Sequence, residues 1–131
     1  MLINSKSFTE VNANNIPTGQ FVPLPNTKFD FSTSKQINDT VIDHNFVVQN
    51  DNETAATITS PCGQLSMDVL SDYPGVQVYT GDYLEGELQP RQGLCIEPQF
   101  YPDSPNHKHF PFEPLQANTN FSKKIVYKLN K

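Results

Sequence analysis

The sequence is poor in cysteine, arginine and long apolar runs, and each shortage excludes a class of protein. Two cysteines, Cys62 and Cys95, are too few for a disulfide scaffold, so we expect free thiols and not the one pair they could form. Arg91 is the only arginine, which leaves no arginine cluster for a phosphate group. No apolar run approaches a membrane span, and the N-terminal MLINSKSFTEV lacks the apolar core of a signal peptide. These features predict a cytoplasmic protein with no membrane partner.

The charge balance is mildly acidic. Lys plus Arg is 9 and Asp plus Glu is 14 in 131 residues, which gives a net charge of −5. Nucleic acids and anionic membranes need clustered cations, so we expect neither as a partner. No Ser/His/Asp nucleophile context and no phosphate-binding glycine loop occurs, which argues against hydrolases and nucleotide-dependent enzymes. A small neutral ligand fits this composition.

Short alternating segments predict strands, whereas no segment has the spacing of an amphipathic helix. The expected strands are 7–11, 45–48, 57–60, 65–69, 76–79, 94–97 and 124–129. The turn 61–64 should join two of them into an antiparallel hairpin. Residues 12–26, with several prolines, are expected to form a loop, and 51–53 a polar turn. The pattern predicts an all-β fold, an antiparallel β-sandwich.

Glu97 is the first candidate functional residue. It ends the expected strand 94–97, where Leu94 and Ile96 face the opposite way. Pro98 follows, and we expect it to interrupt the ladder directly after the carboxylate. A buried or half-buried Glu at such a strand end suits a general base, because burial tunes its proton affinity. A solvent-exposed Glu without a role is the alternative.

Asp43 and Gln77 are the next candidates, and both could bind a polar ligand. Asp43 lies within the apolar segment 41–48, where an Asp is costly unless it is hydrogen-bonded, and it could accept from sugar hydroxyls. Alternatively it is an exposed strand start or a turn cap. Gln77 lies between Val76 and Val78 and so faces away from both. Its amide both donates and accepts, which suits a hydroxyl, although a polar residue on an edge strand would look the same.

The histidine pair His107 and His109 is the one candidate metal site. In an extended segment both side chains would face one way, which permits a shared metal. Nothing nearby has the spacing of a third and fourth ligand, so we favour loop histidines that pack or titrate freely. We therefore expect no metal and no other cofactor.

Three stretches resemble the C-terminal half of the aldose 1-epimerases (galactose mutarotases). They are, in order, VIDHNFVV (41–48), YPGVQVYTGDYL (73–84) and GLCIEPQFYPDSPNHKHFP (93–111). The segments 16–31 and 123–130 are similar to the family's flanking segments, so the resemblance covers nearly the whole chain. It implies that residues 1–131 form the C-terminal portion of such a domain. The implied fold is a partial galactose-mutarotase-like supersandwich.

The resemblance also implies roles for the three candidates. Glu97 matches the catalytic base, Asp43 the acidic residue that holds the sugar, and Gln77 a glutamine that contacts the substrate. The implied reaction interconverts the α and β anomers of an aldose such as galactose or glucose by ring opening, without a cofactor. This function makes the protein an isomerase, and a sugar-phosphate epimerase is disfavoured because Arg91 stands alone.

Part of the family's machinery has no match in this sequence. The acid of the family is a histidine in its first half, and His44, His107 and His109 match no catalytic histidine position. After Glu97 the family usually has a small polar residue, where this chain has Pro98. Half of the sandwich would leave strands unpaired, so we expect an N-terminal half or a second copy of the chain to cover them. The alternatives are a non-catalytic carbohydrate-binding or interaction module and an inactive fragment.

Overall fold

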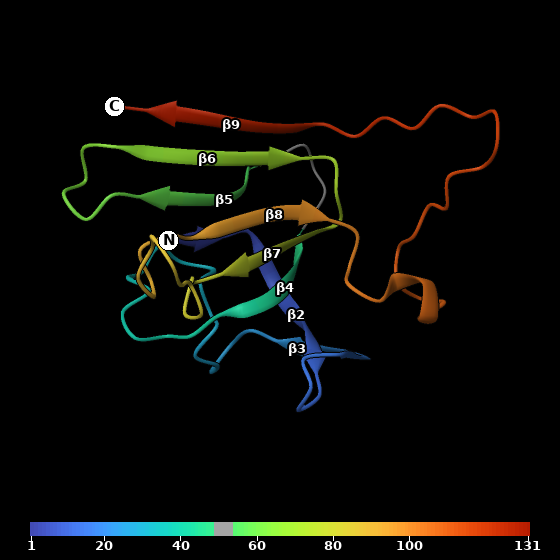
Figure 1. Cartoon of the computed structure of the whole chain (residues 1–131), viewed down its shortest axis with the longest axis horizontal. Coiled ribbons are helices and arrows are strands. Elements are labelled where there is room, and N and C mark those ends of the chain that lie inside the picture. Colours follow the sequence, from blue (N-terminus) through green and yellow to red (C-terminus); the bar gives the residue numbers. More distant parts are fainter. Residues whose placement is uncertain (49–53) are drawn as a thin grey trace.

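Two antiparallel sheets make up the protein (Figure 1). The computed structural model describes residues 1–48 and 54–131. The strands are β1 (Leu2–Ile3), β2 (Ser5–Val11), β3 (Pro17–Pro23), β4 (Asp43–Val48), β5 (Thr54–Thr59), β6 (Ser66–Ser71), β7 (Gly75–Tyr79), β8 (Cys95–Gln99) and β9 (Ile125–Asn130). In the described ranges the helical element is one 3₁₀ turn, η1 (Ser104–Asn106). The expected all-β sandwich is confirmed.

The strand order places β4, β7 and β8 side by side. The five-stranded sheet runs β3-β2-β4-β7-β8 and the four-stranded sheet runs β1-β5-β6-β9. Figure 1 shows β9, β6 and β5 together at the top of the view, with the five-stranded sheet below them. The strands β8 and β9 are therefore edge strands, one in each sheet.

One cluster of buried side chains joins the two sheets. Phe46, Val76 and Val78 come from the five-stranded sheet, and Val69 and Ala56 come from the four-stranded sheet, all without exposed surface. Burying each of the larger side chains stabilises the fold by roughly 1.5–3 kcal/mol. Side chains alternate along each strand, so the residues between these core positions face outward. The core positions therefore determine which side chains lie on the outer face of each sheet.

The expected strands are all present, with bounds shifted by a few residues. The hairpin is confirmed: the Ser60 N–H donates to the Leu65 carbonyl at 2.8 Å, and Gly63 takes the positive φ of +73° that the turn needs. The expected loop 12–26 is wrong over β3. Its prolines stand at the two ends of an edge strand, where a missing N–H is tolerated.

The short strand β1 was also missed, because two residues carry no periodicity and pair only with the distant β5. The expected polar turn 51–53 lies outside the described residues.

Strand β9 presents an uncovered apolar face. Ile125, Tyr127 and Leu129 share one face, as expected, and are 40%, 53% and 68% exposed. Tyr127 lies opposite Val69, which is fully buried, so this face of β9 continues the inner face of its sheet. The Tyr127 hydroxyl donates to the Ile96 carbonyl of β8 at 3.4 Å. The sandwich is therefore open along the side where β8 and β9 form the two edges.

Candidate functional site

A row of polar side chains crosses the outer face of the five-stranded sheet. Asn45 on β4 lies opposite Gln77 on β7, and Gln77 lies opposite Glu97 on β8. Two residues away on each strand, and so on the same face, Asp43 of β4 lies opposite Tyr79 of β7. Directly opposed residues of neighbouring strands share a face, so the antiparallel register brings together all three residues predicted from the sequence.

A short hydrogen bond in the site joins Asp43 and Gln77. The Gln77 Nε2 group donates a hydrogen bond of 2.7 Å to Asp43 Oδ1. A hydrogen bond to an ionised acceptor is stronger than one between neutral groups, so Gln77 fixes the orientation of the carboxylate. Asp43 Oδ2 has no hydrogen-bonding partner among the described residues, so it remains available to a ligand.

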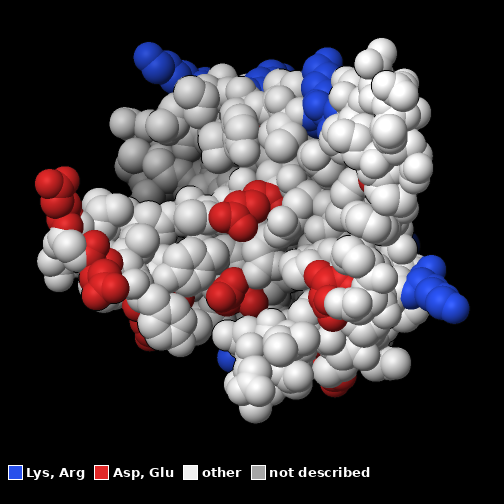
Figure 2. All heavy atoms as spheres, turned by 45° about the vertical axis from the view of Figure 1, so that its right-hand side comes forward, with Lys and Arg blue, Asp and Glu red and all other residues white. Residues whose placement is uncertain are grey.

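The three residues open into one cavity. The cavity has a volume of about 460 Å³ and is lined by Asp43, Gln77, Tyr79, Tyr83, Glu97, Gln99 and Pro102. Carboxylates, amides and aromatic rings line it, with no lysine, arginine or histidine among them. On the face in Figure 2, Asp and Glu side chains lie across the middle, whereas Lys and Arg lie toward the margin. Such a cavity suits a neutral polyhydroxylated ligand better than an anion.

Four lining residues were missed from the sequence. Tyr79 and Gln99 stand two positions after Gln77 and Glu97, so strand alternation could have found them. Tyr83 and Pro102 lie in loops, where no periodicity indicates their direction. The Tyr83 N–H donates to the Tyr79 hydroxyl at 2.7 Å. Tyr83 lines the cavity and is 76% exposed.

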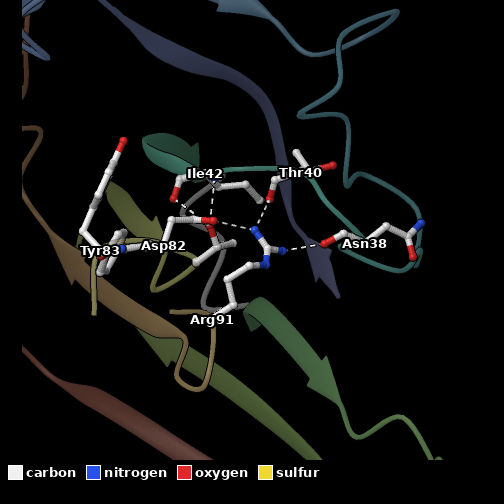
Figure 3. Close-up of polar contacts among 8 residues, drawn as sticks. Asn38, Thr40, Ile42, Asp82, Tyr83 and Arg91 are labelled. Atoms are coloured by element: carbon white, nitrogen blue, oxygen red, sulfur yellow. Dashed lines mark hydrogen bonds and ion pairs between the residues drawn. The ribbon is translucent and has the colours of Figure 1, made fainter. Parts of the chain in front are cut away.

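A second polar network holds the loops around the site (Figure 3). Arg91 forms an ion pair of 2.6 Å with Asp82 and donates to the Asn38 and Thr40 carbonyls. Asp82 also accepts from the Thr80 hydroxyl, which in turn accepts from the Ile42 N–H at 2.9 Å. The Thr80 hydrogen bond, followed by Arg91, holds the pKa of Asp82 below its usual value. The only arginine is therefore engaged in anchoring the segment before Asp43.

Two expectations about Glu97 are wrong. The ladder is not interrupted at Pro98, because Val76 opposes Pro98 and Gly75 opposes Gln99. Proline is tolerated there because β8 is an edge strand. Glu97 is consequently the middle residue of β8 and not its end, and it is exposed, as the alternative interpretation had it.

Gln77 and Asp43 have defined places in the sheet. Gln77 lies on β7, between β4 and β8, so it is not an edge-strand residue. Asp43 is the first residue of β4, but it is half-buried and not exposed as that alternative required, and its carboxylate is hydrogen-bonded to Gln77.

The histidines lie away from the cavity. His44 faces the core, with ring centroids 4.3 Å from Phe29 and 5.4 Å from Phe8. The His109 Nε2–H donates a 2.7 Å hydrogen bond to the Gly19 carbonyl, and His107 Nε2 lies 3.3 Å from Asp103 Oδ2. Both also pack on Phe110, as the packing interpretation predicted. The described residues include no group of three potential metal ligands.

Cys62 and Cys95 are both free, as expected. No helix within residues 1–48 and 54–131 is long and apolar enough to cross a membrane.

Comparison with known proteins decides the family. The sequence model of the aldose 1-epimerase family matches residues 1–128. The chain belongs to the aldose 1-epimerase family. It is 32% identical over 123 residues to the aldose 1-epimerase of Haemophilus influenzae, covering 80% of this chain and 36% of that protein. It is 30% identical over 126 residues to human galactose mutarotase, covering 83% of this chain and 37% of that protein.

Solved structures show the same fold. A crystal structure of an aldose epimerase homologue from C. elegans superposes with a TM-score of 0.91 at 24% identity, covering 98% of this chain and 44% of that one. The galactose 1-epimerase of Lactobacillus acidophilus gives a TM-score of 0.77 at 21% identity, covering 98% of this chain and 42% of that one. The chain thus spans about two-fifths of the length of these family members and matches their C-terminal part.

Proposed function

We propose that this chain binds a neutral aldose in the cavity over β4, β7 and β8 and supplies the base for interconverting its anomers. The observation that supports this most is the Gln77–Asp43 hydrogen bond beside Glu97 on a single face. Asp43 Oδ2 would accept from a sugar hydroxyl, and the exposed Tyr83 ring could stack on the sugar's C–H face. A cavity of about 460 Å³ accommodates one pyranose ring.

Glu97 would remove the proton from the anomeric hydroxyl. As that oxygen becomes the aldehyde oxygen, the bond between C1 and the ring oxygen breaks, and a proton donor protonates the ring oxygen. Rotation about C1–C2 and closure on the other carbonyl face give the second anomer, with both protons returned. The exposure of Glu97 lets it reach a substrate atom directly.

The histidine that serves as the family's acid is the component that this cavity lacks. None of the residues that line it is a histidine, and the resemblance places the family's acid in the first half of the sequence. We propose that residues 1–131 act as the C-terminal portion of an aldose 1-epimerase domain and that a complementary portion brings the acid. Free thiols at Cys62 and Cys95 favour the cytoplasm as the compartment.

The open side of the sandwich supports this partner. The inner face of the four-stranded sheet extends past β8 and is exposed there at Ile125, Tyr127 and Leu129. The family members in the comparison contain more than half of their length beyond the matched region. The occupant we propose is the complementary portion of such a sandwich, contributing extended segments with apolar side chains. A second copy of this chain is the competing occupant, and sedimentation with and without the complementary portion separates the two.

Two measurements test the proposed function. Titration of the isotope-labelled chain with D-galactose should shift the backbone resonances around residues 43, 77 and 97, and no shift at high millimolar sugar would contradict binding. Polarimetry of fresh α-D-glucose should show faster mutarotation once the complementary portion is added.

Binding without any acceleration, in both preparations, would instead favour the non-catalytic carbohydrate-binding module. That candidate is favoured by one observation, the absence of a histidine among the residues lining the cavity.

A further inference from the structure

Asn45 has an unusual environment for a polar side chain. It lies in the polar row, opposite Gln77, yet it is only 1% exposed and does not line the cavity. Neither its Nδ2 nor its Oδ1 has a hydrogen-bond partner among the described residues. Buried amide groups almost always have partners, so an unpaired one calls for a physical explanation.

The surroundings of Asn45 exclude bulk water. A methyl group built on Gly75 would overlap Asn45 Oδ1 and the ring of Tyr101, so glycine is needed for the close approach of these three residues. Tyr101 itself is 6% exposed. The amide is thus enclosed by Gly75 and Tyr101, and a sugar in the cavity cannot contact it.

Gln77 Oε1 is a second buried group without a partner, and it belongs to the residue directly opposite Asn45. The other end of the same amide, Nε2, is engaged with Asp43. Opposed side chains on neighbouring antiparallel strands have Cβ atoms about 4.5–5.5 Å apart, so an Asn donor and a Gln acceptor can be joined directly or by one water. The two unpaired groups therefore complement each other.

We propose that Asn45 is a positioning residue that fixes the direction of the Gln77 amide, donating from Nδ2 to Gln77 Oε1 through one buried water. With Oε1 held in this way, Nε2 must face Asp43. Without it the amide can turn over and present its oxygen to the carboxylate, which removes the donor that orients Asp43. The consequence for sugar binding rests on the proposed function, but the control of the Gln77 amide does not.

The substitution Asn45→Leu separates this role from a purely structural one. Leucine is close in size but leaves the buried Gln77 Oε1 without a partner, so the melting temperature should fall modestly. The NMR signals of the Gln77 side-chain amide should change position and average, because the amide no longer keeps one orientation. The dissociation constant for D-galactose should rise about three- to tenfold, the size expected for one hydrogen bond.

Thr9→Val is the matched control. Thr9 is 1% exposed, and its hydroxyl donates to the Asn45 backbone carbonyl at 3.4 Å, so this change also removes a buried polar group beside Asn45. It should lower stability while leaving the Gln77 amide resonances and galactose affinity unchanged. Equal effects of both substitutions on the Gln77 amide would show that Asn45 acts only through packing, and would overturn the proposal.

A measurement on the unmodified chain covers the case in which Asn45→Leu does not fold. Cross-relaxation should connect the Asn45 side-chain amide protons with a long-lived water or with Gln77, and its absence would overturn the proposal. If the unmodified chain binds no galactose while Asn45→Leu still releases the Gln77 amide, the proposed function fails and the positioning role stands.

Discussion

The outer face of the five-stranded sheet and the inner face of β9 are both accessible to solvent, and their chemistry differs. The first carries carboxylates and amides, of which Asp43 and Gln77 are hydrogen-bonded to each other. The second carries Ile125, Tyr127 and Leu129 with large exposed areas. A polar face with internal hydrogen bonds is stable in water and can await a small ligand, whereas a contiguous apolar face is characteristic of a protein contact. We therefore expect changes at the first to alter sugar chemistry and changes at the second to alter assembly.

The largest effect should come from Glu97→Gln. In a preparation that accelerates mutarotation, this substitution should reduce the rate about 10²- to 10⁴-fold, because it removes the base and keeps the shape. Galactose affinity should change little. Polarimetry measures the mutarotation rate, and ligand titration measures the galactose affinity.

Glu85→Gln, in an exposed loop position outside the cavity lining, is the control and should retain full activity. Retained activity in Glu97→Gln would assign the base elsewhere.

Asp43→Asn should weaken galactose binding about 10- to 100-fold, because hydrogen bonds to a charged acceptor contribute about 1.5–3 kcal/mol. A double-mutant cycle with Gln77→Leu tests whether the two residues act as a unit. Their combined effect should be smaller than the sum of the two separate effects, since each removes the same hydrogen bond. Simple additivity would mean that the 2.7 Å contact does not organise the site.

Leu129→Lys should weaken association along the open side by roughly tenfold, because it places a charge in an apolar contact. Lys128→Ser, on the opposite face of the same strand, should leave association unchanged. Sedimentation of the chain, alone and with the complementary portion, measures both. If neither substitution changes the mass distribution, the occupant of this face does not use β9.

The smallest effect should be a pH dependence of stability from His44. Burial against Phe8 and Phe29 is the main cause that holds the pKa of His44 below its usual 6.5; Asp43 opposes the shift and Lys28 adds to it. The unfolded chain then binds the proton more readily. The contribution to the free energy of unfolding is therefore complete above about pH 6.5 and falls as the pH decreases toward the lowered pKa.

His44→Phe should remove this component, so its unfolding free energy should vary less between pH 7 and pH 5 than that of the original chain. Chemical denaturation at the two pH values tests the difference. An unchanged pH dependence would mean that His44 titrates normally.

Residues far apart in the sequence show how much of the site could be predicted. The directions of Gln77, Leu94 and Ile96 follow from alternation with their neighbours, and all three agree with the structure. The position of Pro98 was misjudged because whether a proline breaks a ladder depends on whether its strand lies at an edge, which is a property of the whole sheet. Tyr83 and Pro102 reach the cavity from loops, whose directions are fixed by long-range contacts.

The sequence by itself determined the all-β class with seven of its strands, the outward direction of Gln77 and the family resemblance, because these depend on side-chain alternation and on residue identity at short spacing. Only the tertiary structure decided that Asp43, Gln77 and Glu97 form one site. That depends on the register of β4, β7 and β8, which is set by packing of their opposite faces against a distant sheet. The tertiary structure also buried Asn45 beside Gly75 and Tyr101 and left β9 uncovered, because burial depends on which segments come to lie against each other.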